Sequence, residues 1–338
     1  MTTAAPQAPT LADLPAAPAG RVGWPWTENS PPMAATAPRG GSWPRISIIT
    51  PSFNQGKYLE ETIRSVLLQG YADLEYFIID GGSTDESVAI IRKYEPWLAG
   101  WVSEGDDGQS DAINKGFARA TGEICNWLCS DDLLTKGSLQ AVARRFAQRT
   151  LIDVVAGACV LQYDDAPDQS GVRQVEWADW RHAPYAGVIW QPSCFFRREL
   201  VCRRNLVLTD LHYCMDRELW SYLWSVNANW EWTEEVFSIF RFTAGNKSSV
   251  GGHKVVNELE AVYRVYFKEA VPLPYLLRQW WLPAVRVRER NRAGWIRLLS
   301  RLTSRGITLV LLALYPRARV RALQRDFYHY GRGQAENS

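Results

Sequence analysis

Three short apolar runs in this chain each lead directly into a polar loop rich in small residues. Ile46–Thr50 leads into ProSerPheAsnGln, Phe77–Asp80 into GlyGlySerThrAsp, and Trp101–Ser103 into GluGlyAspAspGlyGln. Short runs rich in β-branched and aromatic residues predict strands. Parallel strands that empty into polar loops form a ligand site at the carboxyl edge of an α/β sheet. The chain is therefore expected to build such an edge.

The remaining pattern predicts an α/β fold, with a mostly parallel sheet flanked by helices and right-handed crossovers. Strands are predicted at Ile46–Thr50, Glu75–Asp80, Trp101–Ser103, Glu123–Cys129, Asp153–Gln162, Val172–Trp177, Gly187–Trp190, Cys194–Arg197 and Glu235–Arg241. Helices are predicted at Lys57–Leu68, Asp85–Tyr94, Gln109–Ala120, Lys136–Ala147 and Asp216–Trp224. Ser83 and Glu86 have the spacing of a capping box for the second helix.

Composition divides the chain into three parts. Residues 1–44 hold 9 of the 18 prolines and have neither a basic start nor an apolar core. We expect a disordered or loosely draped extension there, neither a signal peptide nor a spanning helix, with Trp24, Trp26 and Trp43 docking its last part on the body. Residues 45–260 form the α/β body, and residues 261–338 form a basic, aromatic helical tail.

Charge is unevenly distributed along the chain. Residues 262–338 carry 15 Lys+Arg against 4 Asp+Glu, whereas the rest of the chain has a net charge of −9. Such a tail favours an anionic partner. The six cysteines show no C-x-x-C spacing, and we interpret them as buried, reduced thiols in a cytosolic protein.

Four polar motifs are candidates for chemistry, and each also has a purely structural interpretation. Gly81–Asp85 suits either backbone approach to an anion or an ordinary strand–helix turn. Lys115 either neutralises a phosphate or forms a solvated pair with Asp111. The acids Asp131 and Asp132 repel each other unless a cation compensates, although Asp132 could instead cap the next helix.

Asp216 is the fourth motif. It is either a proton acceptor or a first-turn partner of the helix dipole. Two nucleotide-binding patterns are missing, G-x-G-x-x-G and G-x-x-x-x-G-K-[ST], which counts against dehydrogenases and P-loop enzymes.

Taken in order, six segments resemble family 2 glycosyltransferases of the GT-A fold. They are residues 48–55, 78–85, 103–116, 127–132, 191–193 and 215–220. The resemblance covers about residues 45–250. It implies that residues 45–162 bind the nucleotide and that residues 163–260 bind the acceptor.

The resemblance also implies roles for single residues. Contacts to the nucleotide sugar are expected from Thr50, Pro51, Ser52, Phe53, Asn54, Asp80, Gly81, Ser83, Asp111, Asn114, Lys115 and Ser130. The family's Asp-x-Asp motif is here Cys129-Ser130-Asp131, so Asp131 becomes the main ligand of Mn²⁺ or Mg²⁺ and Asp132 supports it. Asp216 becomes the catalytic base, and the acceptor side comprises Trp190, Gln191, His212, Arg241 and Lys247.

This resemblance implies an inverting transfer from a nucleotide-diphosphate sugar, with UDP favoured, to a saccharide or lipid-linked acceptor in cell-surface polysaccharide assembly. The missing first acid, at Cys129, motivates the alternative of a catalytically degenerate nucleotide-sugar-binding scaffold. A nucleotidyltransferase would need a Gly-rich basic loop after the first strand, which is absent. Arg, Trp and Leu in residues 262–325 favour an anionic membrane surface, at the inner face of the cell membrane, over nucleic acid.

Overall fold

A computed structural model describes residues 8–37, 40–164, 170–173, 189–204, 206–242, 247, 253–267, 273–291, 293–315, 317, 320–321 and 324. The described chain forms two compact units. The first unit comprises residues 1–175, 190–212 and 228–242, and the second comprises residues 176–189, 213–227 and 243–338. These units group the chain differently from the expected halves at 45–162 and 163–260, because residues 190–212 and 228–242 join the first unit.

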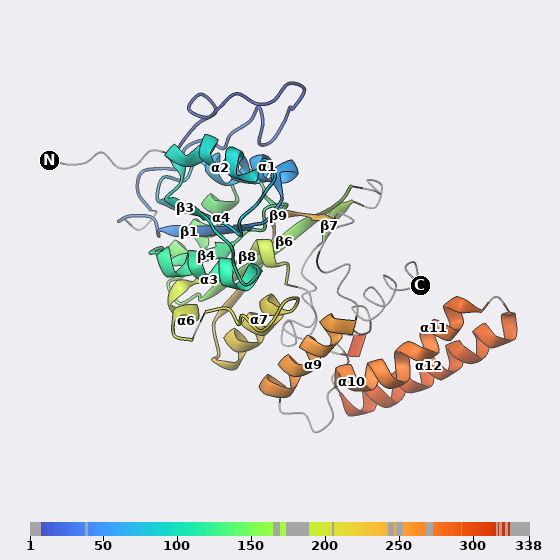
Figure 1. The fold of residues 1–338 in the computed structure, drawn as a ribbon. Coiled ribbons are helices and arrows are strands. Elements are labelled where there is room, and N and C mark those ends of the chain that lie inside the picture. The colour runs from blue at the N-terminus through green and yellow to red at the C-terminus, as the bar shows by residue number, and fades with distance from the viewer. Residues whose placement is uncertain are drawn as a thin grey trace. The chain divides into compact units, whose positions relative to one another are not determined.

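The described residues of the first unit form a nine-stranded sheet (Figure 1). Its strands are β1 (Ile46–Ser52), β2 (Leu74–Asp80), β3 (Gly100–Ser103), β4 (Ile124–Trp127), β5 (Leu133–Leu134), β6 (Val154–Tyr163), β7 (Gly171–Arg173), β8 (Cys194–Arg197) and β9 (Trp230–Phe242). The order is β3-β2-β1-β4-β8-β6-β9-β5, and β7 pairs with β6. β3, β2, β1 and β4 are parallel, as is the β6–β9 pair, so the mostly parallel sheet is confirmed.

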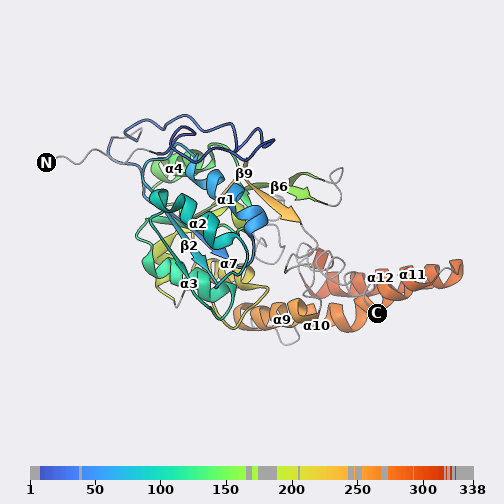
Figure 2. The same ribbon diagram turned by 45° about the horizontal axis from the view of Figure 1, so that its top comes forward.

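Helices cover both faces of the parallel strands. They are α1 (Gly56–Leu67), α2 (Ser87–Tyr94), α3 (Gln109–Arg119) and α4 (Ser138–Gln148), followed by the short α6 (Arg198–Cys202). Alternate residues of β1 face opposite sides of the sheet. Ile46 and Ile48 join the core with α1, α2 and α4, whereas Ile49 lies directly under Gly116 of α3. Figure 2 shows α1 and α2 side by side over the strands.

Several local predictions differ from the structure. α2 begins at Ser87, and the predicted Ser83–Glu86 capping box is wrong, because the Ser83 hydroxyl donates to Asp80 instead. The Asp85 carboxylate accepts from the Ser87 N–H at the start of α2. β5 and α6 were not predicted. The predicted strand at 172–177 ends at Arg173 within the described residues. The predicted strand at 187–190 is described only at 189–190, which is not strand and precedes a 3₁₀ turn at Gln191–Ser193.

The extension packs against the body over residues 8–37, so a disordered segment is not what the structure shows there. Leu14 and Trp26 are buried. The Trp24 indole N–H donates to the carbonyl oxygen of Leu134 at 2.9 Å, which confirms the predicted docking through that residue. The buried Arg64 guanidinium of α1 donates to three carbonyl oxygens of the extension, those of Pro15, Pro25 and Trp26.

The second unit is helical in its described residues. Its helices are α7 (Met215–Ser225), α9 (His253–Phe267), α10 (Leu273–Leu276), a π-helical stretch at Leu277–Trp281, α11 (Leu282–Arg290) and α12 (Gly294–Leu314). α11 and α12 pack side by side as an antiparallel pair (Figures 1 and 2). Among the described helices, none combines the length and the apolar character needed to cross a bilayer.

Candidate active site

The β2–α2 loop is organised by Asp80 at the end of β2. Its buried carboxylate accepts the N–H groups of Gly82 (3.2 Å) and Ser83 (2.9 Å) and the hydroxyls of Ser83 (2.5 Å) and Ser103 (2.7 Å). The neighbouring Gly81 approaches the next loop so closely that a Cβ there would lie 2.7 Å from Asp106 Oδ2. The expected nucleoside contact thus acts here as the internal anchor of the loop.

The β1–α1 loop lies beside this turn. Its Asn54 has a φ of 51°, and its amide oxygen accepts the Thr84 N–H at 2.9 Å, while its own N–H donates to Ser83 Oγ at 2.7 Å. Phe53 is 60% exposed, which leaves its ring free for stacking. Ser52 Oγ is buried and lacks a hydrogen-bond partner. By contrast Thr50 is buried. Its hydroxyl forms a hydrogen bond with the Tyr76 hydroxyl at 3.0 Å, so its side chain points into the core.

Helix α3 presents Lys115 between two carboxylates. Its ammonium lies 3.1 Å from Glu104 and 3.1 Å from Asp111. Hydrogen bonds to Glu104 and then Asp111 raise the pKa of Lys115. The Asn114 amide is used differently from the expectation: it bonds both the carbonyl oxygen and the N–H of Val207 and so fixes that segment against α3.

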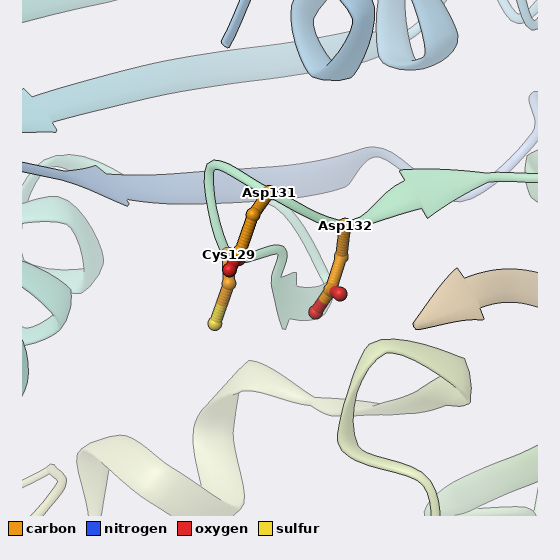
Figure 3. Close-up of side chains that lie close together, drawn as sticks. All are labelled: Cys129, Asp131 and Asp132. Carbon is orange, nitrogen blue, oxygen red and sulfur yellow. The ribbon is translucent and has the colours of Figure 1, made fainter. Parts of the chain in front are cut away.

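Two consecutive acids follow β4 in a tight turn, closed by a bond from the Asp132 N–H to the Cys129 oxygen at 3.0 Å. Figure 3 shows the side chains of Cys129, Asp131 and Asp132 projecting from this turn toward the same space. One ligand atom from each lies within 4.8 Å of the others. Thr62 of α1 supports the turn, because its buried hydroxyl lies 2.9 and 2.8 Å from the carbonyl oxygens of Ser130 and Asp132.

The electrostatics of this turn favour a cation. Asp132 is fully buried; its Oδ1 accepts the Arg241 N–H at 3.1 Å, while its Oδ2 has no hydrogen-bond partner. Burial, followed by repulsion from Asp131, raises the pKa of Asp132 well above its ordinary value, and burial also raises the pKa of Asp131. A buried carboxylate oxygen without a donor is costly unless a positive group faces it. The donor set therefore fits a divalent cation.

Sequence reasoning missed one member of this turn. Cys129 was treated only as a lost acid, yet its thiol belongs to the cluster and accepts from Gln109 Nε2 at 3.2 Å. Its position two residues before Asp131 was the available signal. None of the six cysteines forms a disulfide, but the expectation of six buried thiols is wrong at two positions, because Cys129 is partly exposed and Cys202 is exposed.

The residues expected on the acceptor side lie in different local environments. Gln191 donates to Asn126 Oδ1 (3.1 Å) and to the Trp127 oxygen (2.7 Å), so its amide nitrogen holds the 3₁₀ turn against β4. Trp190 is half-buried and His212 is exposed. Arg241 is buried, pairs with Glu61 at 3.2 Å and stacks on Tyr58.

In the second unit, Asp216 is a partly exposed residue in the first turn of α7. Glu258 of α9 stabilises the start of this helix, because its carboxylate accepts the N–H groups of Tyr213 (2.8 Å) and Cys214 (2.9 Å). The nearby Glu218 is buried and receives a hydrogen bond from the Tyr266 hydroxyl. Lys247 lies over the Tyr213 ring. Of the two acids in this turn, Asp216 is the accessible one.

Parallel strands with ligand loops at their carboxyl edge and an acidic turn after β4 define an α/β protein of the GT-A type. Residues 47–215 match glycosyl transferase family 2, and the chain belongs to that family. A putative teichuronic acid biosynthesis glycosyltransferase of Bacillus subtilis is 32% identical over 127 residues, 37% of this chain and 50% of that protein. The curated relatives are matched over 15% to 50% of their own length.

Solved structures are similar over nearly the whole chain. The mannosyltransferase PcManGT of Pyrobaculum calidifontis, in complex with GDP-Man and Mn²⁺, has a TM-score of 0.58 at 19% identity, covering 91% of this chain and 92% of that one. S. aureus TarS in complex with UDP-GlcNAc has a TM-score of 0.52 at 16% identity, covering 87% and 92%. At such identities the likeness confirms the fold.

Proposed function

We propose that this chain transfers a glycosyl group from a nucleotide-diphosphate sugar, with UDP favoured, to a hydroxyl of a saccharide or glycolipid in cell-surface polysaccharide assembly. The acidic turn of Asp131 and Asp132 carries the proposal, because its unpartnered buried oxygen calls for a cation next to the two loops expected to hold the nucleotide. The names of the similar proteins are consistent with this donor class and this process.

Different loops would contact different parts of the donor. The exposed Phe53 ring offers a stacking surface for the base, and the buried Ser52 hydroxyl, which lacks a hydrogen-bond partner, is the polar group of this loop that a ligand could engage. Asp131 and Asp132 would hold Mn²⁺ or Mg²⁺, which when bound supplies positive charge beside the diphosphate leaving group. Lys115 adds a second positive charge once the phosphates displace its two carboxylate partners, Glu104 and Asp111, from its ammonium group.

The transfer is a single displacement with inversion at the anomeric carbon. Asp216 accepts the proton of the acceptor hydroxyl. The acceptor oxygen forms its bond to the anomeric carbon while the bond from that carbon to the phosphate oxygen breaks, and the nucleoside diphosphate leaves with the electron pair. The partial exposure of Asp216 at the start of α7 supports this role, because a general base must reach the acceptor.

Cys129 favours one competing function, a degenerate nucleotide-sugar-binding subunit, since it stands where the family has an acid. The two functions differ in turnover. Asp216→Asn keeps the side-chain shape but removes the basic oxygen, so transfer should fall about 10²–10⁴-fold while donor affinity changes little. Asp131→Asn should instead weaken Mn²⁺-stimulated donor binding.

The assay is a thermal-shift screen of nucleotide sugars with and without Mn²⁺, followed by transfer rates and donor dissociation constants on the same preparations. Parental transfer by Asp216→Asn would assign the base elsewhere. Donor binding without donor hydrolysis or transfer in the parent, with any cation, would favour the binding subunit.

A further inference from the structure

Helix α12 packs against its neighbours through two serines in its first half and a leucine near its end. Ser300, Ser304 and Leu311 are its buried residues. The Ser300 hydroxyl donates to the carbonyl oxygen of Ala284 in α11, and Leu311 belongs to the core of the second unit. At 100° per residue these three positions lie on one side of the helix. This is the side that α12 turns toward the protein.

Large apolar side chains of α12 are exposed, and among them Trp295, Leu298, Leu302 and Leu309 lie on the side opposite the buried one. Those more than half exposed are Trp295, Leu298, Leu299, Leu302, Leu309, Val310 and Leu314. Leu302 is 55% exposed and lies about 160° around the helix from Ser300. Helices of water-soluble proteins turn the apolar stripe toward the core. α12 departs from this arrangement over its first half, where serines are buried and leucines are exposed, as in helices that pack within lipid.

A row of arginines borders this apolar face. Arg297, Arg301 and Arg305 are all exposed and follow one another at four-residue intervals, so they share one side of the helix. No Asp or Glu occurs in Gly294–Leu314. The row is therefore an uncompensated strip of positive charge within α12, directly beside the leucines.

We propose that the outer face of α12 binds the surface of an anionic phospholipid bilayer. The leucines and Trp295 enter the boundary between headgroups and acyl chains, and the arginine row contacts lipid phosphates. The helix lies along the surface, which agrees with the absence of a membrane-spanning helix among the described ones. A second copy of the chain fits less well, because α12 brings no carboxylate to pair with the arginines. The inference does not depend on the proposed transfer reaction.

The test is sedimentation of the full chain with vesicles of phosphatidylcholine and 30% phosphatidylglycerol, without donor or acceptor. Leu298→Gln/Leu302→Gln/Leu309→Gln should lower the partition coefficient by about tenfold per leucine, since each leucine would otherwise be buried in the interface. The matched control is Val22→Gln/Leu151→Gln, which changes two residues that are 77% and 82% exposed elsewhere. The control should bind like the parent.

The arginine row is tested by Arg297→Gln/Arg301→Gln/Arg305→Gln, which should weaken binding by about fivefold per arginine at low salt. Binding of the parent should fall with added salt and with vesicles of phosphatidylcholine alone. Because all substituted side chains are exposed, the melting temperature should not change. Equal sedimentation of parent and leucine variant overturns the proposal. A lipid-free dimer that the leucine variant abolishes also overturns it, and would assign the face to a second copy.

Discussion

Thr62 connects helix α1 to the acidic turn, so its replacement should reveal how far that turn is preorganised for a cation. Its buried hydroxyl lies within 2.9 Å of two carbonyl oxygens, those of Ser130 and Asp132. Thr62→Val keeps the shape but removes the hydroxyl. Losing one hydrogen bond costs about 1 kcal/mol, and leaving a buried carbonyl without a donor costs about 1–3 kcal/mol. We expect a total loss of about 2–4 kcal/mol in the free energy of unfolding.

Part of this loss should appear in cation binding. If about 1.4 kcal/mol is needed to reorder the turn around the cation, Mn²⁺ affinity falls about tenfold. Thr62→Ser is the matched control, because it retains the hydroxyl. Urea denaturation measures stability, and calorimetric titration with Mn²⁺ measures affinity, for all three proteins. If Thr62→Val binds Mn²⁺ as tightly as Thr62→Ser does, the proposed link between the Thr62 hydroxyl and cation affinity is refuted. Thr62 then has a role in stability alone.

Three further predictions concern the same unit. Arg64→Met should leave three carbonyl oxygens of the extension without their Arg64 donors, lower stability by about 3–6 kcal/mol and expose residues 8–37 to limited proteolysis. Arg64→Lys should lose less stability. Equal protease resistance of Arg64→Met and the parent would contradict this. Burial raises the pKa values of Asp131 and Asp132, so Mn²⁺ affinity should fall as pH falls toward those pKa values. The metal-free protein should lose stability as pH rises through them. A stability in EDTA and a Mn²⁺ affinity that both stay constant with pH would count against this account. Cys129→Ser should weaken Cd²⁺ binding more than Mg²⁺ binding in competition titrations, because thiolate prefers softer cations; equal losses would remove the thiol from the ligand set.

The sequence predicted the sheet well where strands are continuous apolar runs. β1, β2 and β8 agree with their predicted ranges to within two residues, since each is buried for most of its length and has β-branched or aromatic residues at its centre. β5 was missed because a two-residue strand has no periodicity of its own; its pairing with β9 defines it.

The site was predicted in outline, because strand ends locate a ligand edge by topology alone. The roles of single polar residues were harder to predict. Asn114 and Gln191 look like ligand contacts in the sequence, yet their amides hold Val207 and Trp127, which lie 93 and 64 positions away along the chain. Thr62 and Arg64 flank the apolar positions of α1, and the backbone oxygens to which they donate belong to distant segments. Such long-range partners leave no local signal.

The extension at residues 8–37 has a consequence for the order in which the protein is assembled. Its partners come later in the chain: Trp24 bonds to Leu134, and the Pro31 oxygen accepts from Gln140, 109 positions away. During synthesis this segment leaves the ribosome before its partners, and its binding surface exists only after α1 and α4 have formed. Residues 8–37 therefore remain without these partners until synthesis has passed Gln140.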